Sequence, residues 1–116
     1  MVEVDSPKIT MTRGDTLRVS VSIDRDGDAY TPESGDEIQF FLKHNVLNGK
    51  RTAYKDSQPL ITKDVPIATM VLELEPEDTK PLEFGEYVYD LQLTFANGTV
   101  DTFINNAPFK IVPEVG

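Results

Sequence analysis

Apolar and polar residues alternate along several segments of the chain, and this alternation restricts the fold more than any other feature. In "TLRVSVSID" the apolar residues Leu17, Val19, Val21 and Ile23 are each separated by one polar residue. A period of two places such residues on one face of a β-strand and fits no helix. The same pattern predicts buried strand faces in three further segments, made of Ile38, Phe40 and Leu42, of Met70, Leu72 and Leu74, and of Tyr87, Tyr89, Leu91, Leu93 and Phe95.

Shorter strands are expected at residues 8–12, around 60–63 and at 109–112. The prolines Pro32, Pro59, Pro66, Pro76, Pro81 and Pro108 fall outside the alternating segments, as a sheet requires, and no helix is predicted. Turn residues separate about seven short strands, a pattern typical of a β-sandwich. We therefore expect one all-β domain over residues 1–116, an immunoglobulin-like antiparallel sandwich.

Two hairpins have a predicted register. Asn97-Gly98 is expected to form a two-residue turn with positive φ, which sets Phe95 opposite Val100, Leu93 opposite Thr102 and Leu91 opposite Ile104. Asp26-Gly27 is expected to form a similar turn, which sets Ile23 opposite Tyr30.

The stretch "LELEPEDTKPLEFGEYVYDLQL" resembles the corner between strands E and F of immunoglobulin-like sandwiches. There, a buried tyrosine hydroxyl bonds back to the corner backbone, and Tyr87 is the best candidate for this role. The resemblance is architectural, because the chain contains neither the cysteines nor the tryptophan of antibody domains.

The net charge of -9 argues against non-specific nucleic-acid binding. The segment 43–63 is nevertheless basic, with Lys43, Lys50, Arg51, Lys55 and Lys63 against Asp56, which gives +4. It is expected to be either a solvated loop or a contact with an acidic neighbour, in which Lys50, Arg51 and Lys55 would take part. No apolar run is long enough to span a membrane and the first residues do not resemble a signal peptide, so we expect synthesis in the cytoplasm.

No catalytic or metal site is predicted. In "DRDGD" the EF-hand pattern would require glycine at Ala29 and glutamate at Gly35, so the segment is better explained as a hairpin turn. The only histidine, His44, is expected in a loop, no serine lies in a nucleophile-elbow context, and there is no cysteine. We expect a protein that is not an enzyme and that uses no cofactor.

Two phenylalanines are predicted on the outer face of a sheet. If Phe40 points inward, then Phe41 points outward, and the hairpin register places Phe103 and Val88 outward as well. In an immunoglobulin-like sandwich these strands are neighbours in one sheet. We expect these three residues to form either ordinary exposed surface or an apolar patch that binds a partner or a second copy.

The order of these motifs over residues 8–115 resembles small proteins from phages and prophages of Gram-positive bacteria, usually associated with tail or baseplate genes. The resemblance implies a structural or assembly role, tail or baseplate proteins or a second copy as partners, and a place in the virion after assembly. It also implies that Gly14 and Asp15 form a corner between two strands, so that Arg13-Gly14-Asp15 matches the integrin-binding tripeptide by coincidence. The alternative function is carbohydrate or cell-surface binding through Tyr30 and Tyr54.

Overall fold

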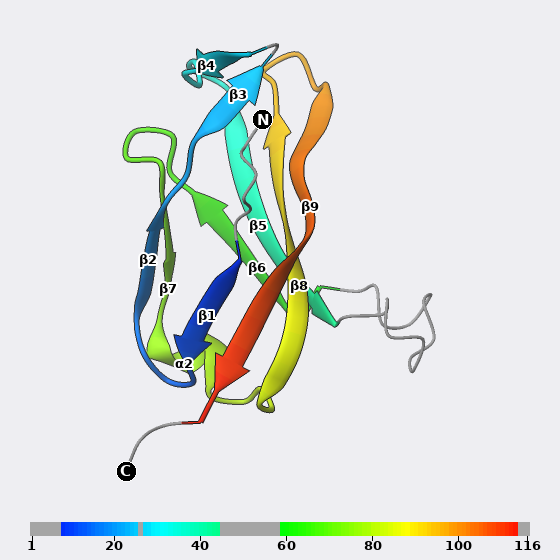
Figure 1. The fold of residues 1–116 in the computed structure, drawn as a ribbon. Helices are drawn as coiled ribbons and strands as arrows, with labels where there is room; N and C mark the ends of the chain where they lie inside the picture. Colours follow the sequence, from blue (N-terminus) through cyan, green and yellow to red (C-terminus); the bar gives the residue numbers. More distant parts are fainter. Residues whose placement is uncertain (1–7, 26, 45–58, 114–116) are drawn as a thin grey trace.

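The computed structural model describes residues 8–25, 27–44 and 59–113, and these residues are mostly in β-strands, as predicted (Figure 1). The strands are β1 (Ile9–Thr12), β2 (Leu17–Ser20), β3 (Ile23–Arg25), β4 (Asp28–Tyr30), β5 (Glu37–His44), β6 (Ile61–Val65), β7 (Val71–Leu74), β8 (Gly85–Thr94) and β9 (Val100–Val112). One short helix, α2 (Pro76–Thr79), was not predicted. Its Glu75 N–H donates to the Asp78 carboxylate at 2.7 Å, and Pro76 at its start needs no backbone donor.

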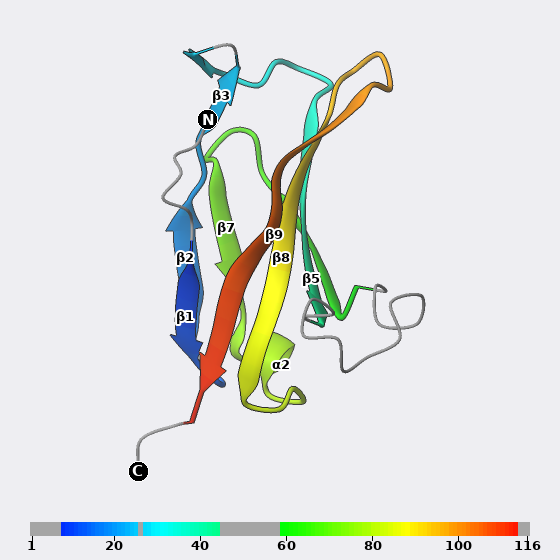
Figure 2. The same ribbon diagram turned by 45° about the vertical axis from the view of Figure 1, so that its right-hand side comes forward.

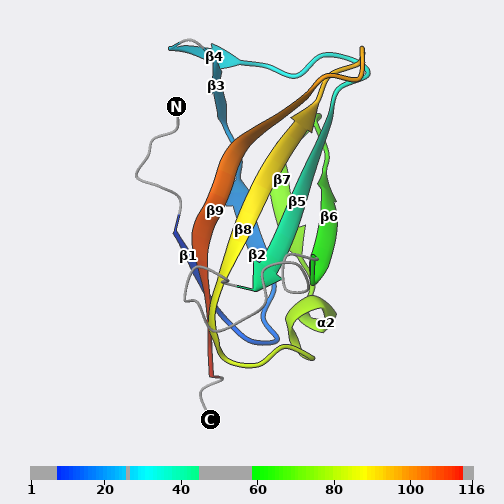
Figure 3. The ribbon, with the colours of Figure 1, turned by 90° about the vertical axis from the view of Figure 1, so that its right-hand side faces the viewer.

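A five-stranded sheet with the order β1-β9-β8-β5-β6 forms one layer of the molecule (Figure 3). The neighbouring position of β9, β8 and β5 is the one predicted. The pairing of β1 with β9 is parallel, from Ile9 opposite Phe109 to Thr12 opposite Val112, so the expectation of a purely antiparallel fold is wrong.

The antiparallel pair β2–β7 forms the second layer, which Figure 2 shows beside the inner face of the large sheet. Between the layers lies one hydrophobic core. Most of the residues predicted from the alternation are buried in it: Val21, Ile23, Ile38, Phe40, Leu42, Leu72, Leu74, Tyr87, Tyr89, Leu91 and Leu93. Leu17, Val19, Met70 and Phe95 are only partly buried and pack against it. Two packed sheets fit a sandwich, while the immunoglobulin-like topology stays a prediction. Among the described residues, no helix is long and apolar enough to cross a membrane.

The long strand predicted from Leu17 to Asp24 is divided in two. β2 pairs with β7, whereas β3 leaves this sheet and pairs with β4. Between them, the Val21 N–H donates to the Met70 carbonyl at 2.8 Å. Met70 has φ 56° and precedes β7, so its predicted place within that strand is wrong.

The β3–β4 hairpin lies at the upper end of the molecule, level with the β8–β9 turn and apart from it (Figures 1 and 3). Ile23 lies opposite Tyr30, which confirms the predicted register, and Gly27 has φ 87°. Asp26 lies outside the described residues.

The base of this hairpin is held by Asp36. The Asp36 carboxylate accepts the Tyr30 hydroxyl at 2.6 Å, the Glu33 N–H at 2.9 Å and the Ala96 N–H at 3.1 Å. The Tyr30 ring also meets Phe95 edge to face at 5.9 Å. One carboxylate therefore joins the hairpin, the segment before β5 and the β8–β9 turn.

The predicted register at the tip of the β8–β9 hairpin is wrong by one residue. Thr94, and not Phe95, lies opposite Val100, because the turn contains three residues. The Gly98 N–H donates to the Phe95 carbonyl and the Phe95 N–H to the Thr99 carbonyl. Only Gly98 has positive φ, at 94°, which fits a type I turn followed by a bulge at glycine.

Two irregularities in β9 change which of its residues face outward. Gln92 lies opposite Thr102 and Leu91 opposite Ile104, so Phe103 is an extra residue and the predicted Leu91–Ile104 pair is restored. A second shift follows between Tyr89 and Leu91, where the Asn106 N–H donates to Asp90 Oδ1 at 2.8 Å. Bulges of this kind re-aim side chains and disrupt pairing along an edge.

Pro108 lies within β9, although the sequence placed it outside the strands. It is opposite Val88 of β8, and β1 pairs with β9 only from Phe109 onward. At this position the strand has a partner on one side only, which is where a sheet tolerates proline.

The lower end of the molecule contains the Arg13-Gly14-Asp15 corner, between β1 and β2. Gly14 has φ 84°, and its N–H donates to Thr79 Oγ1 of α2 at 2.9 Å. The Asp15 N–H closes the corner onto the Thr12 carbonyl at 3.2 Å. The predicted structural corner is confirmed.

Tyr87 stabilises the connection between α2 and β8. Tyr87 is 6% exposed, and its hydroxyl donates to the Glu83 carbonyl at 2.7 Å, which confirms the predicted tyrosine corner.

Candidate binding face

The outer face of the five-stranded sheet carries the main candidate site. Because Phe40, Leu42, Tyr87, Tyr89, Phe109 and Ile111 point into the core, the residues that alternate with them point outward. Phe41, Lys43, Val88, Asp90 and Pro108 lie on this outer face.

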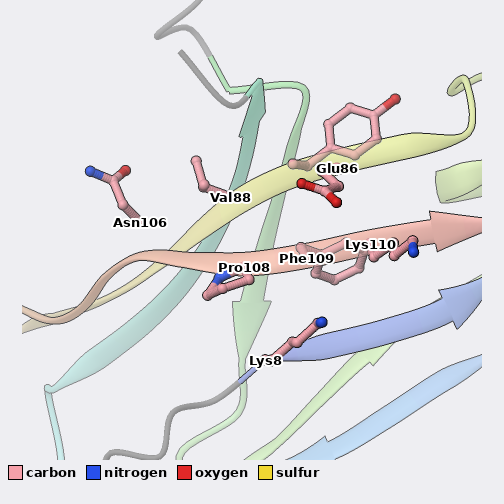
Figure 4. Close-up of a pocket in the computed structure, with 8 residues that line it drawn as sticks. Lys8, Glu86, Val88, Asn106, Pro108, Phe109 and Lys110 are labelled. Atoms are coloured by element: carbon pink, nitrogen blue, oxygen red, sulfur yellow. The ribbon is translucent and has the colours of Figure 1, made fainter. Parts of the chain in front are cut away.

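A hollow of about 330 Å³ lies on this face, across β8, β9 and the start of β1 (Figure 4). Val88 and Pro108 supply its apolar side chains, and Lys8, Glu86, Asn106 and Lys110 supply polar ones. Figure 4 shows Glu86 and Val88 on β8, Pro108 and Lys110 on β9, and Lys8 at the start of β1. The hollow therefore combines an apolar floor with charged groups from β8, from β9 and from the residue just before β1.

An ion pair lies between the hollow and Phe41. Lys43 Nζ is 2.8 Å from Asp90 Oδ2, and the two side chains are 19% and 16% exposed. Lys43 is opposite Val88, and Phe41 is opposite Asp90. The Lys43–Asp90 ion pair therefore lies along one diagonal of these four residues, and Phe41 and Val88 lie along the other. Asp90 also accepts the Asn106 N–H, which fixes its carboxylate in place.

The structure brings together two of the residues predicted for an interface. Phe41 is half-buried on the outer face, and Val88 lies diagonally beside it, but Val88 is only 5% exposed and forms a floor instead of a projecting contact. Phe103 does not belong to this face, because the bulge turns it to pack against the core. Lys50, Arg51 and Lys55 lie outside the described residues.

In the part of the chain that the structure describes, no group of three or more His, Asp or Glu side chains is placed to hold a metal ion. His44 ends β5 instead of lying in a loop, and it stacks on Tyr87 with ring centroids 5.9 Å apart. Burial raises the pKa of Tyr89 to about 12, which keeps its hydroxyl protonated. The hydrogen bond from Tyr30, followed by those from Glu33 and Ala96, lowers the pKa of Asp36.

The Arg13 side chain is held within the molecule. Its guanidinium lies 4.4 Å from the centre of the Phe84 ring, and Nη1 is 3.4 Å from the Leu82 carbonyl. The tripeptide is thus a corner whose glycine contacts α2 and whose arginine contacts the α2–β8 connection.

Of the two tyrosines of the alternative carbohydrate site, Tyr30 is half-buried. Its hydroxyl donates to Asp36, its ring meets Phe95, and both rings line a hollow at the upper end of the sheet. Tyr54 lies outside the described residues.

Comparisons of the chain with protein-family models, with curated proteins and with solved structures found no match. The relationship to phage proteins is therefore a proposal that rests on the sequence resemblance.

Several residues of this outer face were not predicted from the sequence. Lys8, Pro108 and Lys110 meet only because β1 and β9 pair in parallel across most of the chain length. The alternation around Phe109 and Ile111 was the available signal, since it predicts that Lys110 points outward. No comparable pattern indicates the burial of two polar residues, Thr79, which is fully buried, and Asp36, which is 7% exposed.

Proposed function

We propose that the protein is a non-enzymatic assembly module that binds other proteins through the outer face of its five-stranded sheet. The resemblance of its motif order to small tail-associated proteins supports a place in a phage or prophage tail or baseplate.

One observation carries this proposal: Phe41 and the apolar floor of the hollow lie beside charges held in fixed positions. A specific protein contact needs apolar surface for affinity and placed charges for orientation. The Lys43–Asp90 pair, held also by the Asn106 N–H, provides such charges next to Phe41.

The test is co-expression of the protein with the product of each gene that flanks its own, followed by size-exclusion chromatography. We expect one product to co-elute with the wild type and to be lost with Phe41→Ser. Val100→Ser is the matched control, because Val100 is an apolar residue with 52% exposure at the β8–β9 tip, away from the face.

Two results would contradict the proposal. One is that no flanking product binds. The other is that Phe41→Ser and Val100→Ser bind equally well. Polysaccharide binding that is lost in Tyr54→Ala would support the carbohydrate alternative instead.

A further inference from the structure

We propose that Lys63 keeps the β6 edge of the five-stranded sheet from pairing with the same edge of a second copy of this chain. The inference is independent of the proposed function, because it concerns the edge of the sheet and not its outer face.

The β6 strand ends the five-stranded sheet in the part of the chain that the structure describes. Five consecutive residue pairs join it to β5, from Ile38 opposite Val65 to Leu42 opposite Ile61, without a register shift. The other side of a regular edge strand presents unpaired N–H and C=O groups, which can form a ladder with a strand of another molecule. β6 is therefore a position at which two copies could join.

The opposite edge of the sheet is less suited to such pairing. β1 has only four residues, and the part of β9 that extends beyond β1 contains two bulges. Short strands and bulges are two of the devices that protect sheet edges. β6 contains neither a bulge nor a proline, so a side chain has to give the corresponding protection.

Lys63 has the position that such protection requires. It lies between Ile61 and Val65 in the alternation of β6, and both of these neighbours are buried in the core. It is also opposite Phe40, which is 0% exposed, so the lysine side chain leaves the strand toward the inner face of the sheet. An inward-pointing charge on an edge strand opposes edge-to-edge pairing, because an added strand would bury it.

The Lys63 ammonium is held at this place by α2. Its Nζ is 3.0 Å from Asp78 Oδ2, and the two side chains are 29% and 20% exposed. The same Asp78 oxygen accepts the Glu75 N–H at 2.7 Å, so the carboxylate is fixed at the start of the helix. Side chains of a strand added beside β6 would displace the water that still reaches this pair. Desolvation of two charges opposes that addition, so contacts between copies are directed to the faces of the sandwich.

The experiment is sedimentation equilibrium of the full chain with Lys63→Met, which removes the charge and keeps an unbranched side chain. We expect Lys63→Met to associate at least about tenfold more tightly than wild type. Hydrogen exchange of the associated variant should be slower at the amides of β6, because these are the groups that form the new ladder.

Three further variants separate the charge from the ion pair. Asp78→Asn breaks the ion pair, keeps an oxygen that accepts the Glu75 N–H and leaves the lysine charged, so its association should match that of wild type. Lys63→Arg keeps the inward charge and should match wild type as well. Lys63→Met/Asp78→Asn leaves no unpaired charge, and it should associate like Lys63→Met even where the single variant folds poorly. Circular dichroism of each variant checks that the fold is intact.

The inference would be overturned by association of Lys63→Met and of the double variant that is no tighter than that of wild type. Association of Asp78→Asn as tight as that of Lys63→Met would also overturn it, because loss of the ion pair would then be the cause. Association that leaves the exchange of the β6 amides unchanged would have the same consequence. Binding of a flanking gene product through Phe41 is a separate measurement, so the proposed function and this inference can each fail alone.

Discussion

Replacement of Gly14 tests how much the corner between β1 and β2 depends on backbone conformation. Gly14 has φ 84°, a region in which a Cβ atom costs roughly 1–2 kcal/mol. Its N–H also donates to the fully buried Thr79 hydroxyl, and loss of that bond adds about 1 kcal/mol. We therefore expect the free energy of unfolding to fall by about 1–2 kcal/mol in Gly14→Ala and about 2–3 kcal/mol in Gly14→Val.

Urea titration followed by circular dichroism measures this loss. With a slope of roughly 1–3 kcal/mol per molar for a small protein, Gly14→Val should lower the midpoint by about 1 M. Gly14→Asn is the matched control, because asparagine tolerates positive φ better than alanine or valine does. Equal stability of Gly14→Ala and wild type would refute the reasoning, as would Gly14→Asn being as unstable as Gly14→Val.

Three further changes test single contacts. Tyr87→Phe removes the donor to the Glu83 carbonyl and should cost about 1 kcal/mol in thermal unfolding, and an unchanged melting temperature would contradict the tyrosine corner. The hydrogen bonds of Asp36 lower its pKa below the usual 3.8, so its stabilisation is complete above that pH and is lost as the pH falls further. Asp36→Asn should therefore be less stable at neutral pH and lose less stability on acidification, and parallel pH profiles would argue against this role. Since the pKa of Tyr89 is raised from 10.0 to about 12, the unfolded state ionises first, and stability should fall between pH 10 and 12. Tyrosinate absorbance and alkaline unfolding of Tyr89→Phe check this, and an unaltered alkaline transition in the variant would count against it.

The buried face of each strand could be predicted because alternation is a local property of the sequence. Ile38, Phe40 and Leu42 are buried at 0–1% exposure without any knowledge of their neighbours. The Ile23–Tyr30 pair was also predictable, because an Asp-Gly turn fixes the register of the adjoining strands.

Features that depend on distant residues could not be predicted. Phe103 packs against the core because a three-residue turn and the bulge at Phe103 itself shift the register of this part of β9. The hollow requires the parallel β1–β9 pairing, which joins residues 9 and 109. Of the predicted interface, Phe41 and Val88 meet on one face because the alternation decides their direction, whereas their exposure depends on what packs around them.

The parallel pairing of β1 with β9 determines how the molecule would resist mechanical force. If the chain is pulled before β1 and after β9, the two strands are drawn in opposite directions along their length (Figure 1). The four residue pairs from Ile9–Phe109 to Thr12–Val112 then carry the load together in shear, whereas an antiparallel pair pulled from one end would open one bond at a time. Nearly the whole chain lies between these strands in sequence, so the core cannot be extended until this ladder breaks.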